Sequence, residues 1–370
     1  MPPFIASCWS LLHSAICWTV FPLIQFLQTA LKLKGSRLAE LQHPAKDLPK
    51  PNGPSGYADT CLTVQHQTGL DIIGVGAAGQ VYNVDEDIVL KTCRIYEPPS
   101  EQATPRALWD YASETIFHFG LLKDERAILR LLAERPHPNI IEVIDVDQPE
   151  GIYLRKYRPL SAIQPASQSD RILWYRDLIR ALLHLHTLGV THSDIRTDNV
   201  LFDANGHAVL SDFGASCPFG YPNPSLPVLM NGPSETVSDA TDRFAMASMI
   251  YELETGGRPE IVSADAAGGL ILPVVQTGNR HLDSLIEKAW QGRFNSTAAM
   301  LQHVESVNDD YGDDGEKDGG DHRQADVDRA SRSKLRERII SWRTNRVAQY
   351  GNMLTAFLCF HCKSWSLDLY

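Results

Sequence analysis

Residues 192–214 read HSDIRTDNVLFDANGHAVLSDFG, and this stretch decides the fold. Short apolar runs flank Asn205-Gly206, a dipeptide typical of a tight β-hairpin. Asp194 and Asn199 precede the hairpin, and Asp212 follows it. Carboxylate and amide oxygens suit Mg²⁺, and a carboxylate also accepts the proton of an attacking hydroxyl. The stretch therefore carries groups that could bind a metal ion or accept a proton, without assigning these roles to individual residues.

A glycine-rich motif lies upstream. Gly74, Gly76 and Gly79 follow the pattern G-x-G-x-x-G, which lets the backbone approach phosphates closely. The same pattern also opens dinucleotide-binding folds, where a helix follows the glycines. Here residues 81–91 alternate as two strands around an Asp-Glu-Asp turn. A hairpin after the glycines contradicts a dinucleotide site and favours a lid over phosphates.

Together these motifs resemble the protein kinase family over residues 65–306. The glycine motif continues to Val81 as G-x-G-x-x-G-x-V, and Lys91 ends an Ile-Val-Leu-Lys run like the family's V-A-I-K. The resemblance implies transfer of the γ-phosphate of ATP to a protein, with Mg²⁺ as cofactor. The site residues that it implies are Asp194, Lys91 and Arg196 for catalysis; Gly74, Gly76, Gly79, Val81, Val89, Lys91, Glu125 and Leu201 around ATP; and Asn199 and Asp212 for the metal.

The lysine of such a site needs a glutamate partner on the next helix. Residues 123–134 have helical periodicity, with residues 127, 128, 131 and 132 on one face. The resemblance makes Glu125 the partner of Lys91, and Glu114 on an upstream helical stretch is the competitor.

Further positions have counterparts in the family. The resemblance places the adenine-binding hinge at residues 154–159, puts His192 and Phe213 in the internal hydrophobic column of the fold, and makes Asp242 a structural brace of the catalytic loop. Arg196 stands where Ser/Thr kinases usually carry lysine, which favours a Ser/Thr kinase over a tyrosine kinase.

Two features depart from the family pattern. Ser193 replaces the arginine that normally precedes the catalytic aspartate and reads a phosphate on the activation loop. Switching by loop phosphorylation is therefore in doubt. The A-P-E motif is also degraded: Gly232-Pro-Ser-Glu235 is the nearest match, with Arg293 as the expected partner of Glu235.

The predicted fold is α+β and bilobal, with a small antiparallel sheet before a mainly helical lobe. The expected domain boundaries are 1–34 for a membrane anchor or surface helix, 35–62 for a linker, 63–307 for the kinase domain (lobes 63–157 and 158–307), 308–328 for an acidic disordered linker, and 329–370 for a C-terminal helical tail.

Charge, cysteine content and hydrophobicity indicate which partners and which cellular compartment to expect. The net charge of −11 argues against a nucleic-acid partner. Seven irregularly spaced cysteines fit a reducing compartment, which indicates an intracellular, cytoplasmic protein. Residues 11–31 are mostly apolar and are followed by Lys32, Lys34 and Arg37. That pattern fits a membrane anchor with the kinase domain facing the cytoplasm, and an amphipathic surface helix or a non-native leader are the alternatives.

Two alternatives to an active protein kinase remain. Ser193 and the degraded A-P-E motif favour a nucleotide-binding pseudokinase or scaffold. The missing A-P-E motif also suits a small-molecule kinase of the same fold. The intact glycine motif and Glu125 with its following loop fit a protein kinase better.

Overall fold

The computed structural model describes residues 62–67, 69–76, 79–100, 102–226, 228–264, 269–306 and 321–350. These lie in one compact unit, Thr60–Tyr370. The predicted anchor at residues 11–31 lies outside the described residues. Of the helices described in these ranges, none has the length and apolar character to cross a bilayer.

The first five strands form one antiparallel sheet with the order β1-β2-β3-β5-β4. Their bounds are Ile72–Val75 (β1), Gly79–Asn83 (β2), Ile88–Cys93 (β3), Val143–Asp145 (β4) and Ile152–Arg155 (β5). β3 is buried along its whole length. Its apolar side chains alternate between two clusters, with Val89 in the main core and Ile88 and Leu90 in a second one. This sheet is therefore covered on both faces, as its continuous apolar run indicates.

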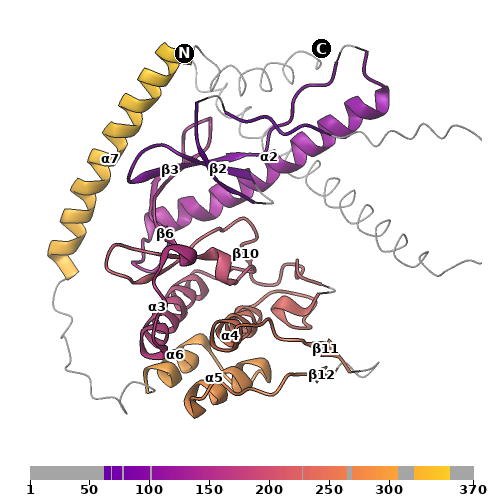
Figure 1. The fold of residues 1–370 in the computed structure, drawn as a ribbon, viewed down its shortest axis with the longest axis vertical. Coiled ribbons are helices and arrows are strands. Elements are labelled where there is room, and N and C mark those ends of the chain that lie inside the picture. The colour runs from indigo at the N-terminus through magenta and orange to yellow at the C-terminus, as the bar shows by residue number, and fades with distance from the viewer. Residues whose placement is uncertain are drawn as a thin grey trace, which may run out of the picture. The chain divides into compact units, whose positions relative to one another are not determined.

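The second half of the chain is mainly helical (Figure 1). Its elements are β6 (Arg158–Pro159), η1 (Leu160–Ala162), α3 (Gln168–Thr187), β7 (Val190–Thr191), η2 (Thr197–Asn199), β8 (Val200–Phe202), β9 (Ala208–Leu210), β10 (Cys217–Pro218), η3 (Leu229–Asn231), α4 (Asp239–Thr255), β11 (Val262–Ser263), β12 (Leu270–Ile271), α5 (Arg280–Trp290) and α6 (Thr297–Glu305). The predicted α+β fold, a sheet-bearing lobe followed by a helical lobe, is confirmed.

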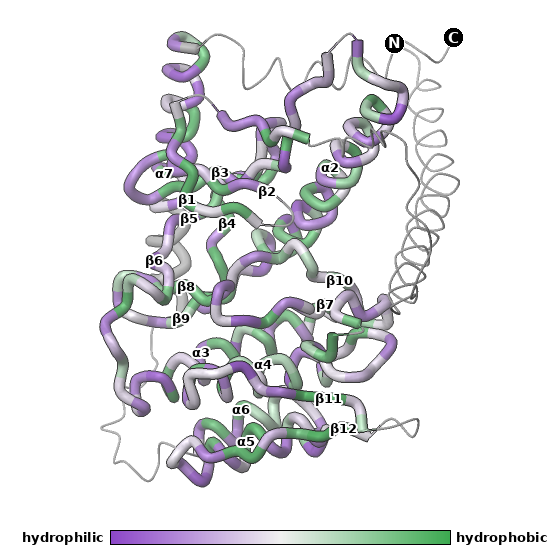
Figure 2. The backbone as a smooth tube through the Cα atoms, turned by 45° about the vertical axis from the view of Figure 1, so that its right-hand side comes forward, coloured by the Kyte–Doolittle hydropathy of each residue, from purple (hydrophilic) through white to green (hydrophobic). Residues whose placement is uncertain are grey.

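Local signals explain where these helices begin and end. Ser167 and Ser238 form capping boxes at the starts of α3 and α4, and Gly256 ends α4 in the left-handed conformation with φ of 77°. α5 alternates hydrophobic and hydrophilic residues along its length (Figure 2). Its buried side chains recur at helical spacing, which identifies the face that packs against α4. They are Leu282, Leu285, Ile286, Ala289 and Trp290.

The helix α2 is longer than the sequence analysis predicts. It spans Pro105–Glu134, because Thr104 caps it by accepting from Ala107 N and the proline occupies its first turn. The predicted apolar face is wrong at Ala127, which is exposed. The buried face of this part of the helix instead carries Leu122, Glu125, Leu129 and Leu132. The prediction assumed that only apolar residues line the buried face, but the charged residue Glu125 is part of it, so the true face is rotated relative to the predicted one.

The C-terminal helix α7 (Asp321–Tyr350) packs against the small sheet, and it starts eight residues before the expected tail. Leu335 and Ile339 are buried in the second cluster with Ile88, Leu90, Ile144 and Tyr153. Trp342 meets Tyr153 edge to face, with 6.1 Å between ring centroids. α7 therefore covers the sheet face that the main core leaves open.

Two arginines of α7 form ion pairs with acidic residues next to the strands of the sheet. Arg338 pairs with Asp85 at 2.8 Å and with Asp87 at 2.7 Å in the turn between β2 and β3. Arg343 pairs at 2.6 Å with Glu150, next to β5. The acidic Asp-Glu-Asp turn thus receives a basic partner from almost the other end of the chain.

We expect Ile339→Ala to destabilise the protein by about 2–5 kcal/mol, because it deletes a side chain that is only 1% exposed. The neighbouring Ile340 is 61% exposed, so Ile340→Ala is the matched control and costs less than about 0.5 kcal/mol. Urea unfolding of the full chain measures both. Equal losses in the two variants would contradict the packing of α7 on the sheet.

Candidate active site

One buried lysine joins three segments that are distant in the sequence. Lys91 on β3 is 6% exposed, and its Nζ lies 2.7 Å from Oε1 of Glu125 on α2. The same Nζ lies 2.7 Å from Oδ1 of Asp212, which follows β9. The structure therefore brings together the predicted lysine, its glutamate partner and one predicted metal ligand. The competitor Glu114 is instead an exposed residue whose carboxylate lies 3.5 Å from His118.

The Lys91 ammonium and the Asp212 carboxylate stabilise each other's charge, whereas burial raises the pKa of the Glu125 carboxyl despite the adjacent ammonium. Burial alone would lower the pKa of the Lys91 ammonium, but the carboxylates of Glu125 and Asp212 outweigh burial and raise it. Burial opposes ionisation of Asp212 as well, and the adjacent ammonium nevertheless holds the pKa of that carboxyl below its usual value. Lys91 is therefore cationic and Asp212 anionic at neutral pH, as recognition of phosphate and metal requires.

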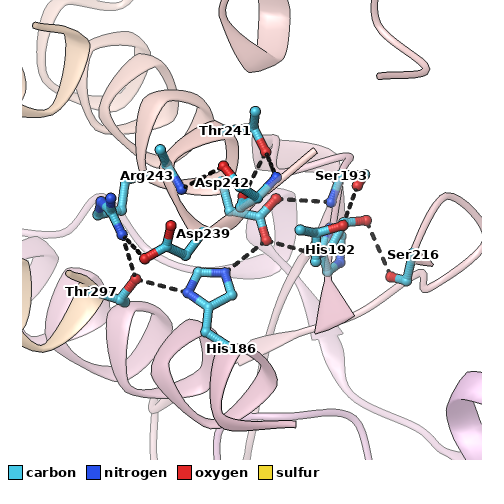
Figure 3. Close-up of polar contacts among 12 residues, drawn as sticks. His186, His192, Ser193, Ser216, Asp239, Thr241, Asp242, Arg243 and Thr297 are labelled. Carbon is cyan, nitrogen blue, oxygen red and sulfur yellow. Dashed lines mark hydrogen bonds and ion pairs between the residues drawn. The ribbon is translucent and has the colours of Figure 1, made fainter. Parts of the chain in front are cut away.

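The catalytic loop, residues 192–199, is anchored by a buried carboxylate. Asp242 on α4 is fully buried and accepts from the backbone N of His192 at 2.7 Å and of Ser193 at 3.0 Å (Figure 3). His186 contributes a third contact to the same carboxylate, at 3.0 Å. Ser193 has φ of 65°, an uncommon value for a residue with a side chain. The two backbone bonds to Asp242 offset the cost of that conformation.

The loop presents Asp194 next to the predicted metal ligands. Asn199 donates from Nδ2 to the Asp194 carbonyl at 2.8 Å and to its carboxylate at 3.0 Å, which leaves Asn199 Oδ1 as an acceptor. The Asp212 oxygen Oδ1 takes the bond from Lys91. A set of carboxylate and amide oxygens fits a hard cation such as Mg²⁺.

His192 ties the catalytic loop to the loop of Asp212. Its Nε2 lies 3.0 Å from the carbonyl oxygen of Ser211, and its ring meets Phe213 edge to face at 5.0 Å. The position of Asp194 is therefore coupled to that of Asp212 through His192.

The three glycines of the glycine-rich motif lie on or next to strands β1 and β2. No side chain fits at Gly79, because a Cβ there would lie 1.9 Å from the carbonyl oxygen of Thr92. Gly76 lies close to Asp212, since a Cβ at Gly76 would be 3.8 Å from Asp212 Oδ2. Gly74 lies on β1 opposite Val81 of β2. Residues 77 and 78 are not among the described residues.

The predicted adenine-binding side chains share one apolar cluster. Val89 is buried in it, and Val81 and Leu201 are half-buried against it. Val81 on β2 pairs with Lys91 on β3, so the apolar contacts lie next to the lysine. The predicted hinge at residues 154–159 runs from the end of β5 into β6.

One expected ion pair is absent from the described residues, and one unexpected ion pair is present. The expected pair of Glu235 and Arg293 is wrong: both are exposed, and no ion pair joins them within the described part of the chain. The arginine buried in this region is Arg243, which pairs with Asp239 and donates to the carbonyl of Phe294 (Figure 3). Arg196 forms an ion pair with Asp198, which the sequence analysis did not foresee.

Comparison with known proteins agrees with this geometry. The model of the protein kinase domain matches residues 68–261, which is more than half of the chain. The chain belongs to the protein kinase family. The match includes Lys91, Glu125, Asp194, Asn199 and Asp212.

Individual kinase relatives are distant. The chain is 28% identical over 180 residues to a probable cyclin-dependent kinase 10 of Dictyostelium discoideum, covering 43% of this chain and 44% of that protein. It is 26% identical over 229 residues to the serine/threonine-protein kinase SSK22 of Saccharomyces cerevisiae, covering 50% and 16%. It is 25% identical over 211 residues to the serine/threonine-protein kinase PrkC of Bacillus subtilis, covering 51% and 30%. The chain thus spans less than half the length of each of these relatives.

Glu125→Gln should destabilise the kinase fold by about 1.5–3 kcal/mol, the cost of losing a charged hydrogen bond around a buried ammonium. Glu114→Gln is the matched control, and its exposed carboxylate contributes less than about 1 kcal/mol. Guanidinium unfolding compares the two variants. The pairing would be refuted by a larger loss at Glu114 than at Glu125.

Proposed function

We propose that this chain is an ATP- and Mg²⁺-dependent protein kinase that phosphorylates serine or threonine. The observation that carries the proposal is the position of Asp194. Its loop is fixed by Asp242 and Asn199, and His192 couples that loop to Asp212 and thereby to the Lys91 cluster. This arrangement supplies a base and a charged phosphate site in one place.

Each residue has a role in such a transfer. The Lys91 ammonium, fixed by Glu125, neutralises charge on the α- and β-phosphates of ATP. Asn199 and Asp212 would hold Mg²⁺, and the ion would supply positive charge close to the phosphates of ATP. Asp194 orients the substrate hydroxyl and accepts its proton. Val81, Val89 and Leu201 enclose the adenine ring.

The Ser/Thr specificity is supported by the relatives, of which SSK22 and PrkC are named serine/threonine-protein kinases. Arg196 also fits this specificity, because it occupies the position of the lysine that Ser/Thr kinases usually carry.

A nucleotide-binding scaffold is the second candidate, and one observation favours it. Arg196 pairs with Asp198 two residues on, so its guanidinium is engaged before any phosphate arrives. A scaffold would bind ATP and Mg²⁺ without transferring phosphate.

The test incubates the full-length chain with γ-labelled ATP, Mg²⁺ and a generic protein substrate. We expect label on serine and threonine, and we expect Asp194→Asn to lower the rate by about 10²–10⁴-fold, the range that a general base contributes. Asp147→Asn, an exposed carboxylate remote from the loop, should leave the rate unchanged. Removal of Mg²⁺ with a chelator should stop the transfer.

Nucleotide binding without label transfer in the wild type would reject the kinase in favour of the scaffold. Label on tyrosine alone would reject the Ser/Thr specificity. Transfer that persists in Asp194→Asn would reject the role of Asp194.

A further inference from the structure

The segment that follows Asp212 contains no side chain suited to read a phosphate. Between Arg196 and Arg243 the sequence has neither lysine nor arginine, and Ser193 is neutral too. A phosphorylated residue in this segment would therefore have neither the arginine that normally precedes the catalytic aspartate nor a cationic partner from the segment itself. The segment must be ordered by other contacts.

Both ends of the segment are fixed by backbone hydrogen bonds. Strand β10 pairs with β7 directly before the catalytic loop, with Cys217 opposite Thr191. Further along, Gly220 N donates to the carbonyl of Val237 at 2.9 Å, and Val237 N donates back to the carbonyl of Tyr221 at 2.8 Å. The two arms of the segment, residues 217–226 and 228–237, are thus joined to each other and to the strand that precedes the catalytic loop.

A buried asparagine organises the interior of this loop. Asn223 is 7% exposed, and its Nδ2 donates to the carbonyl of Ser234 at 2.9 Å. Its Oδ1 accepts from the backbone N of Ser225 at 3.1 Å and from the Ser225 hydroxyl at 3.0 Å. One neutral amide therefore joins the two arms of the segment.

A second buried asparagine connects the segment to the catalytic loop. Asn231 is 2% exposed, and its Nδ2 donates to the carbonyl of Ser193 at 2.8 Å. Its backbone N donates to the Ser225 hydroxyl at 3.1 Å, and its Nδ2 also lies 3.4 Å from Asn223 Oδ1. The Ser193 carbonyl belongs to the peptide bond that precedes Asp194. Asn231 therefore holds the backbone next to the candidate base at the Ser193 carbonyl, while Asp242 holds it at the Ser193 nitrogen.

We propose that Asn231 is a positioning residue for Asp194. We further propose that the amide contacts of Asn231 and Asn223 order the segment that follows Asp212, the activation segment, without phosphorylation. The inference rests on the proposed function, because it concerns the regulation of the same site. It assigns to neutral hydrogen bonds the task that an arginine and a phosphate perform elsewhere in the family. The kinase is then active as synthesised, and phosphorylation of residues 214–237 does not switch it on.

The test uses the phosphatase-treated full-length chain. The wild type should keep its rate of phosphate transfer after treatment. Asn231→Asp replaces the donor with a carboxylate that cannot donate to the Ser193 carbonyl, and it should lower kcat about tenfold, the effect of one buried hydrogen bond. The KM for ATP should stay unchanged, because Lys91 and the glycine-rich loop are untouched. Ser234→Ala, an exposed position in the same segment, is the matched control and should retain the wild-type kcat.

The inference fails if phosphatase treatment abolishes the activity of the wild type. It also fails if Asn231→Asp lowers thermal stability but leaves kcat unchanged, since Asn231 would then be structural only. A merely destabilised variant is distinguished by measuring kcat well below its unfolding temperature.

Hydrogen exchange keeps this inference separate from the proposed function. If the untreated wild type transfers no phosphate, the proposed function fails, and the ordering is then judged by exchange alone. Slow exchange of the Gly220, Asn223 and Val237 amides in the phosphatase-treated chain supports ordering by neutral contacts. Fast exchange of these amides overturns it.

Discussion

The buried ammonium of Lys91 is the constraint on which the rest of the site depends. Removing such a charge from water is costly unless opposite charges compensate it, and Lys91 has two carboxylates at 2.7 Å. One comes from α2 and the other from the loop after β9, so the pairing sets both the rotation of α2 and the position of Asp212. It also links the sheet to the helical lobe. The contact that joins the sheet to the helical lobe at Lys91 is therefore also the contact that forms the candidate phosphate site.

A second electrostatic centre serves the catalytic loop. Asp242 is fully buried and its charge is balanced mainly by backbone donors, which fix the loop without occupying Asp194. Ser193 is held at its backbone nitrogen by Asp242 and at its carbonyl oxygen by Asn231, so the peptide bonds on both sides of it are fixed. The two centres are joined through His192, whose bond to Ser211 reaches the loop of Asp212. The base and the phosphate site are thus positioned by one continuous set of contacts.

Local spacing made the core of the fold and the site predictable. The glycines, Lys91 and residues 192–214 form short motifs that carry the resemblance to the protein kinase family, and that resemblance implied the two lobes and the pairing of Lys91 with Glu125. The packing of α7 on the sheet was not predictable, because contacts such as Arg338 with Asp87 join residues about 250 positions apart. The start of α2 was missed because its first turns expose Leu108 and Trp109 and show no clean apolar face, although Thr104-Pro105 marks the start. Asn231 matched no motif, and only the folded loop reveals its contact with Ser193.

The most direct test of this account is a double-mutant cycle on the dissociation constant of Mg²⁺–ATP, measured by calorimetry with the full-length chain. Lys91→Met and Glu125→Gln should each weaken binding, and the double variant should bind no more weakly than Lys91→Met alone, because Glu125 acts only through the lysine. Independent, additive losses would contradict the central claim that these residues form one unit that holds the phosphates.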